Sequence, residues 1–222
     1  MKVYKTNKLF FGKWVYKIET SVPGANLIKH WGLRLDTSAV IRLRQGYGRS
    51  FTDQDRDQLV KYAEAIKPFV DKDFKTRNEW NTLNYFINDP DLYQDLKRVL
   101  KDWIVSVNEP TSEEDVQTLQ AKSSNILCNE LPYGKYKYRL YIKSSMPVHQ
   151  RSQFRDWLKN YNEKIQYSKS TSEWLGGKSY YSQAPFLYVE DQSLLLMVKM
   201  FLGTWVNRTQ EFIPRNTQNL VK

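Results

Sequence analysis

The chain has 222 residues, a formal net charge of +10 and a hydrophobic share of 41%. That share is large enough to build a packed core, so the composition excludes a wholly disordered chain. No run of about eighteen apolar residues occurs, and the lysine-rich start lacks the apolar stretch of a signal peptide. We therefore expect a soluble cytoplasmic protein without a membrane partner, or a virion-associated one if the chain is viral.

Metal, disulfide and cofactor chemistry have little support in the sequence. Cys128 is the only cysteine, and His30 and His149 are the only histidines. One cysteine excludes an internal disulfide framework, and so few soft ligands argue against a zinc site. A phosphate-binding loop is also missing, because Ser172 stands where the motif ending at Ser179 requires its first glycine. We therefore expect no cofactor.

Positive charge is concentrated in the last part of the chain. Residues 133–222 carry 14 Lys and Arg against 6 Asp and Glu, whereas residues 1–109 carry 19 against 14. The segment between them, 110–132, is acidic and then polar. Clustered Lys and Arg favour a polyanionic partner, because they release the counterions condensed on phosphates. A nucleic acid is therefore the expected partner, although a basic surface also promotes solubility by itself.

Three sequence blocks recur in the same order in the two halves of the chain. The matching blocks are 12–18 with 134–140, 79–80 with 173–174, and 87–104 with 189–206. Recurrence of several blocks in one order indicates that a supersecondary unit has been duplicated. We therefore expect two units of similar architecture.

The second half shows the elements of this unit most clearly. Residues 135–143 alternate between polar and apolar side chains, which predicts a half-buried strand. The later elements expected are a helix at 150–161, a strand within 164–184, a strand at 186–189, a helix from Asp191 to Gly203 and a strand at 205–213. This order, strand, helix, strand, strand, helix, strand, is that of the ferredoxin-like arrangement.

We therefore predict an α+β protein with two tandem ferredoxin-like units whose sheets are antiparallel. The first unit, 1–109, is expected to carry an insertion at about 24–70 that includes a helix starting near Thr52. Residues 110–132 are expected to form a linker, and residues 133–222 the second, more basic unit. In such a unit the two helices cover one face of the sheet and leave the other face open.

Period-two alternation predicts which side chains lie on the open face. The residues of the second unit's first strand expected to face the helices are Tyr136, Tyr138, Leu140 and Ile142. The candidate binding residues on the open face are Lys135, Lys137, Arg139, Tyr141, Lys143, Phe186 and Tyr188. The residues that the same reasoning exposes in the first unit are Lys13, Val15, Lys17, Glu19 and Phe86. The first unit is therefore the poorer platform.

Such a face resembles that of RNA-recognition-motif domains, in which bases stack on aromatic side chains and basic side chains follow the backbone. The resemblance is architectural, because residues 180–188 lack the glycines of that family's third-strand signature. It implies that the four basic candidates neutralise phosphates and that the three aromatic candidates stack bases. We therefore expect a non-catalytic protein that binds single-stranded RNA or DNA.

An enzymatic alternative stays open. Tandem ferredoxin-like units in a basic chain also resemble the CRISPR repeat-processing endoribonucleases, in which a histidine near the first helix commonly cleaves RNA without a metal. That resemblance implies His30 as the catalytic candidate, although the glycine-rich C-terminal loop of that family is missing. A histidine beside Trp31 is also explained as a packed, hydrogen-bonded side chain. We therefore favour a binding protein over an enzyme.

A third interpretation is a structural protein of a virus or mobile element. Its tyrosine-rich sheet face would pack against other copies, and its basic side would meet a genome, because aromatic side chains serve interfaces as well as base stacking. This interpretation predicts homo-oligomers. Asp89 in the first half matches Asp191 in the second half. We interpret both as helix caps rather than as catalytic groups.

Overall fold

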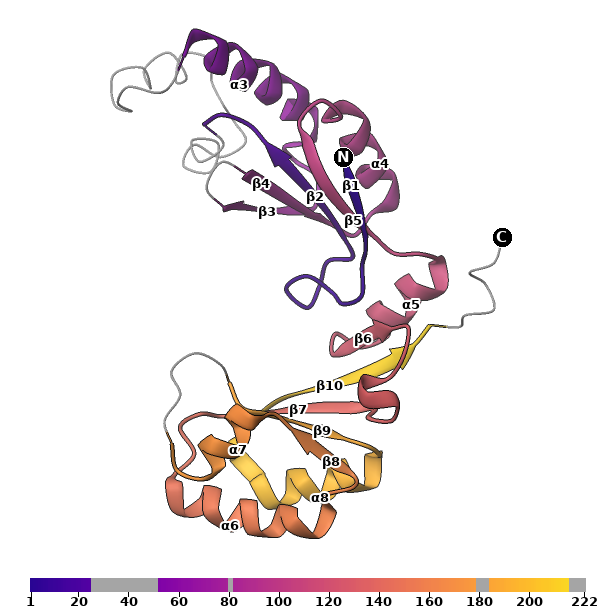
Figure 1. Ribbon diagram of the computed structural model, residues 1–222. Coiled ribbons are helices and arrows are strands. Elements are labelled where there is room, and N and C mark those ends of the chain that lie inside the picture. The colour runs from indigo at the N-terminus through magenta and orange to yellow at the C-terminus, as the bar shows by residue number, and fades with distance from the viewer. Residues whose placement is uncertain (25–51, 80–81, 179–183, 216–222) are drawn as a thin grey trace. The chain divides into compact units, whose positions relative to one another are not determined.

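The computed structural model describes residues 1–24, 52–79, 82–178 and 184–215 (Figure 1). The chain divides into two compact units, Met1–Gln120 and Ala121–Lys222, which we call unit 1 and unit 2. Each unit contains one five-stranded sheet with helices packed against it. The protein is therefore of the α+β class.

The division falls inside segment 110–132, which the sequence suggested as a linker. This segment contains helix α5 (Glu113–Ala121) and strand β6 (Asn125–Cys128). Strand β6 pairs with the last strand, β10 (Val206–Pro214), and is therefore part of the sheet of unit 2. Three acidic residues in the first turn of α5 favour its start there, because they complement the helix dipole.

The sheet of unit 1 has the strand order β1-β5-β2-β4-β3. Its strands are β1 (Lys2–Lys5), β2 (Tyr16–Ser21), β3 (Phe74–Glu79), β4 (Thr82–Ile87) and β5 (Ile104–Glu109). The helical segments that join them are α3 (Asp53–Ile66), the 3₁₀ turn η2 (Lys67–Phe69) and α4 (Pro90–Val99). Strand β1 is parallel to β5, and the other neighbours are antiparallel.

The sheet of unit 2 has the strand order β6-β10-β7-β9-β8. Its further strands are β7 (Tyr138–Ile142), β8 (Ile165–Tyr167) and β9 (Phe186–Val189). Its helical segments are η3 (Pro132–Gly134), α6 (Val148–Leu158), η4 (Lys159–Tyr161), α7 (Lys169–Leu175), α8 (Gln192–Leu202) and η5 (Gly203–Trp205). Strand β6 is parallel to β10, and the other neighbours are antiparallel.

Both sheets follow one plan. After an edge strand, β1 or β6, the chain supplies four strands that lie in the order fourth, first, third, second. The edge strand is parallel to the fourth strand in both units. The sequence predicted antiparallel sheets, and each sheet in fact contains one parallel edge strand in addition to its antiparallel strands. Alternation did not predict β1 or β6, because a strand of only four residues is too short to show a period.

Local capping explains where several helices begin and end. Thr52 caps α3 in a capping box with Asp55, and Asp89 and Asp191 cap α4 and α8 through the backbone N–H groups that follow them. Gly203 ends α8 with a φ of 52°, which a glycine adopts without steric cost. Helix α7 was not expected in 164–184, and it begins where the Ser168 side chain accepts a hydrogen bond from the N–H of Thr171.

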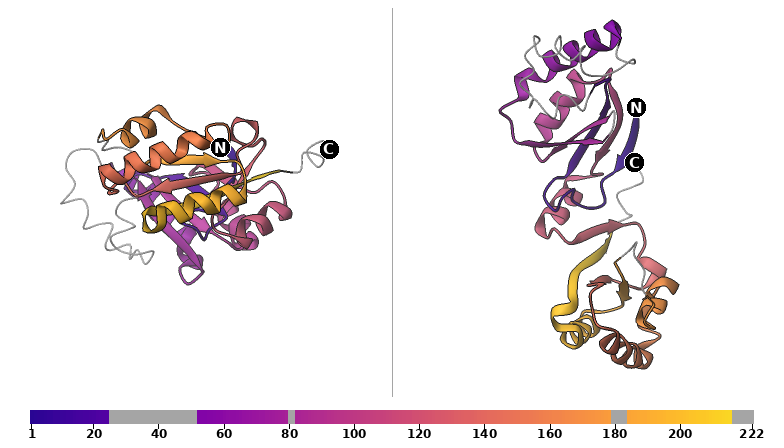
Figure 2. Two further views of the ribbon diagram at one scale, coloured as in Figure 1. Left: turned by 90° about the horizontal axis from the view of Figure 1, so that it is seen from below. Right: turned by 90° about the vertical axis from the view of Figure 1, so that its left-hand side faces the viewer.

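In each unit the helices cover one face of the sheet. Figure 1 shows α6 and α8 on the same side of the unit 2 strands, where Phe154 and Val198 pack against Leu140, Leu187 and Val189. The right-hand view of Figure 2 shows the helices of unit 1 on one side of its strands. The sheet side chains that point away from the helices are therefore the ones available for function.

A chain of buried hydroxyls crosses the core of unit 1. The Tyr62 hydroxyl is 2.7 Å from the Thr20 hydroxyl and 2.6 Å from the Tyr85 hydroxyl. Thr20 also donates to the carbonyl oxygen of Leu83 at 2.9 Å. Burial raises the pKa of Tyr62 to about 12 and also raises the pKa of Tyr85, because a phenolate would lose its hydration in this core.

This hydroxyl chain predicts that unit 1 loses stability in strong alkali. The folded state favours the neutral tyrosines, so their contribution is complete below the unfolded pKa of about 10 and is lost as the pH rises toward about 12. Urea unfolding at a series of pH values measures this loss. In a Tyr62→Phe/Tyr85→Phe variant the decline should be shallower. A decline as steep as in the parent protein would contradict this assignment.

Candidate binding surface on the second sheet

The face of the unit 2 sheet opposite the helices carries rings and arginines. In the register, Arg139 lies opposite Tyr188 on β9 and opposite Gln210 on β10, and Tyr141 lies opposite Phe186. Their neighbours along the strands belong to the helix-side core. The positions that alternate with this core form what we call the open face: Ile126, Cys128, Arg139, Tyr141, Gln166, Phe186, Tyr188, Arg208, Gln210, Phe212 and Pro214.

Aromatic rings run continuously along this face. We call these six residues the aromatic row: Tyr133, Tyr136, Tyr141, Phe186, Tyr188 and Phe212. The ring centroids of Tyr141 and Phe186 are 5.5 Å apart, and those of Phe186 and Tyr188 are 5.4 Å apart. Phe212 and Tyr136 are buried, whereas Tyr141, Phe186 and Tyr188 are half-buried. The row thus has a packed base and rings that still reach solvent.

Tyr133 stands at the end of this row in an unusual backbone conformation. Its φ is 53°, a left-handed value that costs energy for a residue other than glycine. The following Gly134 has a φ of 76°. This turn places the Tyr133 ring 5.6 Å from Tyr188 and 5.8 Å from Tyr136 while the residue stays 70% exposed. Sequence reasoning missed Tyr133 because it precedes the predicted strand.

Arg139 occupies the middle of the open face. Its Nε and Nη2 atoms donate to Oε1 of Gln210 at 3.0 and 2.7 Å. Its guanidinium carbon lies 5.2 Å from the ring centroid of Tyr141, 5.7 Å from that of Phe186 and 5.3 Å from that of Phe212. These distances allow cation–π attraction, and the Gln210 oxygen holds the guanidinium in one orientation.

Arg208 adds a second cation, and the sequence did not indicate it. Its guanidinium carbon lies 4.1 Å from the ring centroid of Tyr141, and its side chain is exposed. The pairing of β10 with β7 shifts register between Val206 and Arg208, and this irregularity brings Arg208 opposite Tyr141. A register shift depends on two distant strands, so alternation within β10 could not predict it.

Lys137 lies away from the aromatic row. Its Nζ is 3.4 Å from Oε1 of Glu211, and Lys122 reaches the other oxygen of that carboxylate at 3.3 Å. The expected alternation breaks before β7 begins at Tyr138. Tyr136, which alternation placed on the helix side, instead packs near Tyr188 on the open face, with ring centroids 6.2 Å apart.

The other two lysine candidates lie at the margins of the sheet. Lys135 is exposed, donates to the carbonyl oxygen of Glu163, and has its Nζ 5.1 Å from the ring of Tyr136. Lys143 follows the end of β7, where its N–H donates to the carbonyl oxygen of Trp205 and its side chain is exposed. The structure therefore brings four candidates together, Arg139, Tyr141, Phe186 and Tyr188, and leaves the lysines around them.

The corresponding face of unit 1 is covered by its own chain. Phe10 and Phe11 pack on Phe86, with ring centroids 5.5 and 4.8 Å from it, and Phe86 is only 4% exposed. Val15, which was expected to be exposed, is fully buried. Lys17 is bound to Glu19 at 3.1 Å instead of being available to a ligand. Phe86, Val15 and Lys17 are therefore engaged within unit 1.

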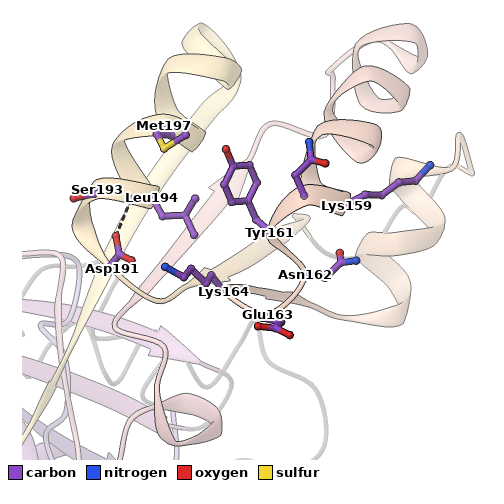
Figure 3. Close-up of a pocket in the computed structure, with 10 residues that line it drawn as sticks. Lys159, Tyr161, Asn162, Glu163, Lys164, Asp191, Ser193, Leu194 and Met197 are labelled. Atoms are coloured by element: carbon purple, nitrogen blue, oxygen red, sulfur yellow. Dashed lines mark hydrogen bonds between the residues drawn. The ribbon is translucent and has the colours of Figure 1, made fainter.

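Figure 3 shows a pocket on the helix side of unit 2, with a volume of about 620 Å³. Tyr161 of η4 lies on one side of it, and Leu194 and Met197 of α8 lie on the other. The Asp191 carboxylate in its wall accepts a hydrogen bond from the N–H of Leu194 at 2.8 Å, so it is engaged as a helix cap. The pocket therefore offers a mixed surface of polar and apolar side chains.

His30, the catalytic candidate, lies outside the described residues. Within the part of the chain that the structure describes, no three His, Cys, Asp or Glu side chains gather as metal ligands. Of the helices in that same part, none has both the length and the apolar character needed to cross a bilayer. Comparison with models of known protein families, with curated proteins and with solved structures found no significant match to this chain.

Two substitutions compare a buried ring of the aromatic row with an exposed cation beside the row. We expect Phe212→Ala to lower the free energy of unfolding by about 3 kcal/mol, because it leaves a cavity where the buried ring of Phe212 was. Arg208→Ala should change it by less than about 0.5 kcal/mol, because that side chain is exposed. Urea denaturation measures the free energy of unfolding of both variants and of the parent protein. Equal losses would mean that the burial of this face is misassigned.

Proposed function

We propose that the open face of unit 2 binds single-stranded nucleic acid, RNA or DNA, without catalysis. The observation that carries this proposal is a continuous aromatic row with two arginines beside it, on an open face without a carboxylate among its strand positions. Within the five described strands of this sheet, no open-face position is Asp or Glu. At these strand positions a polyanion meets arginines and no carboxylate, and its bases meet rings.

The proposal includes an architectural part, in which both units are ferredoxin-like and arose by duplication. The strand order fourth, first, third, second, with helices after the first and third strands, supports this interpretation. The shared parallel edge strand supports duplication further, because the ferredoxin-like plan does not require it. Unit 1 would then be the copy whose open face has been closed by Phe10 and Phe11.

Base stacking would supply the sequence-independent part of the affinity. Tyr141, Phe186 and Tyr188 are each half-buried, and the exposed Tyr133 extends the platform at one end. A base stacked on one aromatic side chain contributes roughly 1–3 kcal/mol. The rings are already held by their neighbours, so binding immobilises few rotamers and retains most of that energy.

Basic side chains at the edges of the aromatic row would contact the phosphates. Arg208 lies over Tyr141, and Lys135 and Lys143 flank β7 with exposed side chains. Because Lys137 is bound to Glu211, we assign it a smaller part in binding than the sequence suggested. Electrostatic contacts of this kind release counterions and make the affinity depend on salt.

A specific observation favours a second candidate function, assembly into homo-oligomers. Helix α8 exposes four large apolar side chains on its outer side: Leu196 at 59%, Met197 at 43%, Met200 at 76% and Phe201 at 41%. Clustered exposed apolar side chains often mark protein interfaces. The described residues give no comparable support to the endoribonuclease alternative, which rests on His30.

Fluorescence anisotropy with a labelled single strand tests the binding proposal. We expect binding at low salt, with a logarithm of affinity that falls by about 0.7 per phosphate contact for each tenfold rise in salt. Arg208→Ala should weaken binding about fivefold, because one cation and its contact with the Tyr141 ring are lost. Lys159→Ala is the control, since it removes one positive charge from η4 outside the open face, where Lys159 pairs with Asp156 at 2.8 Å.

Two results would contradict the proposal. One is the absence of measurable affinity for single strands of either nucleic acid at low salt. The other is an equal loss of affinity in Arg208→Ala and Lys159→Ala, which would mean that net charge alone, rather than the open face, attracts the strand.

A further inference from the structure

The amide of Gln210 is held in one orientation on the open face. Its Oε1 accepts two hydrogen bonds from Arg139, at 3.0 and 2.7 Å. An amide oxygen has two lone pairs, so these two bonds use its accepting capacity. Among the described residues, none accepts a hydrogen bond from Nε2 of Gln210, which leaves two N–H donors for a ligand.

The groups around this amide are also donors. Arginine carries five N–H donors and no acceptor, and both arginines of the open face lie near Tyr141. The other amide of this face, Gln166, lies on β8, two strands away from β7. Tyrosine hydroxyls both donate and accept, so they do not select between ligands. The centre of the open face therefore offers hydrogen-bond donors in excess.

Purines differ in what they present to such a surface. Guanine offers two adjacent acceptors, O6 and N7, whereas adenine offers N7 beside an N6 amino donor. A free glutamine recognises adenine by using its oxygen and nitrogen together, and arginine recognises guanine through O6 and N7. With its oxygen bound to Arg139, Gln210 cannot accept from the adenine amino group.

We propose that Arg139 and Gln210 give this face a preference for guanine over adenine in single strands. This inference rests on the proposed nucleic-acid binding and adds base selectivity to it. The two purines stack almost equally well, so their edges decide the difference. A favourable two-bond contact discriminates by roughly tenfold or more, and we expect about tenfold here because the face is partly open to water.

The test measures the affinity of the full chain for oligothymidylates that carry one central purine. Guanine should bind about tenfold more tightly than adenine. Replacing guanine by 7-deazaguanine removes the N7 acceptor while keeping the stacking surface, and it should lose most of that advantage. Fluorescence anisotropy at low salt gives all three affinities.

The variant Gln210→Glu replaces the amide, which donates through its NH₂ group, by a carboxylate, which only accepts hydrogen bonds. The carboxylate still accepts from Arg139 and leaves no N–H donor, so the guanine preference should disappear. Gln166→Glu makes the same charge change elsewhere on the open face and should retain the preference. Circular dichroism and urea unfolding test whether both variants fold.

The outcomes separate this inference from the function on which it rests. Equal affinity for the guanine and adenine strands, or tighter binding of adenine, would overturn the preference and leave single-strand binding standing. A preference that survives in Gln210→Glu would overturn the assignment to this amide. No binding to any of the strands would contradict the proposed function itself.

Discussion

Helices pack on one face of each sheet, and the rest of the structure depends on this constraint. In unit 2, Leu140, Leu187 and Val189 are fully buried beneath α6 and α8. Successive side chains of a strand point to opposite faces, so burial of these residues forces Arg139, Phe186 and Tyr188 to the other side. A one-residue slip in register would bury Arg139, which makes the hydrophobic core the element that orients the open face.

The two units use this constraint differently. In unit 1, the segment between β1 and β2 returns over the sheet, and Phe10 and Phe11 pack on Phe86. In unit 2, the equivalent segment between β6 and β7 contributes Tyr133 and Tyr136 to the row instead of closing the face. One strand plan thus supports a covered face in one unit and an open face in the other.

Helix caps, helix ends and strand faces could be predicted from the sequence, because residues close together in the chain determine them. The caps at Thr52 and Asp191 and the end of α8 at Gly203 follow from side-chain and backbone preferences near one position. Alternation along residues 138–142 placed Arg139 and Tyr141 correctly on the face opposite the helices. The α+β class followed from the order of these elements.

Other features depend on partners that are distant in the sequence. Strands β1 and β6 are too short to show a period, and their places in the sheets are set by pairing with β5 and β10. Arg208 joins the open face through a register shift, and Lys137 leaves it because Glu211 on β10 lies within reach. Such pairings are decided by tertiary packing, which a single sequence window does not contain.

The most direct measurement of the central claim is photo-cross-linking of a single strand to the full chain, followed by mass spectrometry of the linked peptides. If the open face of unit 2 binds the strand, the cross-links should lie in the peptides that contain Tyr133, Tyr141, Phe186 and Tyr188, and excess unlabelled strand should abolish them. Cross-links confined to α6, α8 or unit 1, with none at the aromatic row, would contradict the claim.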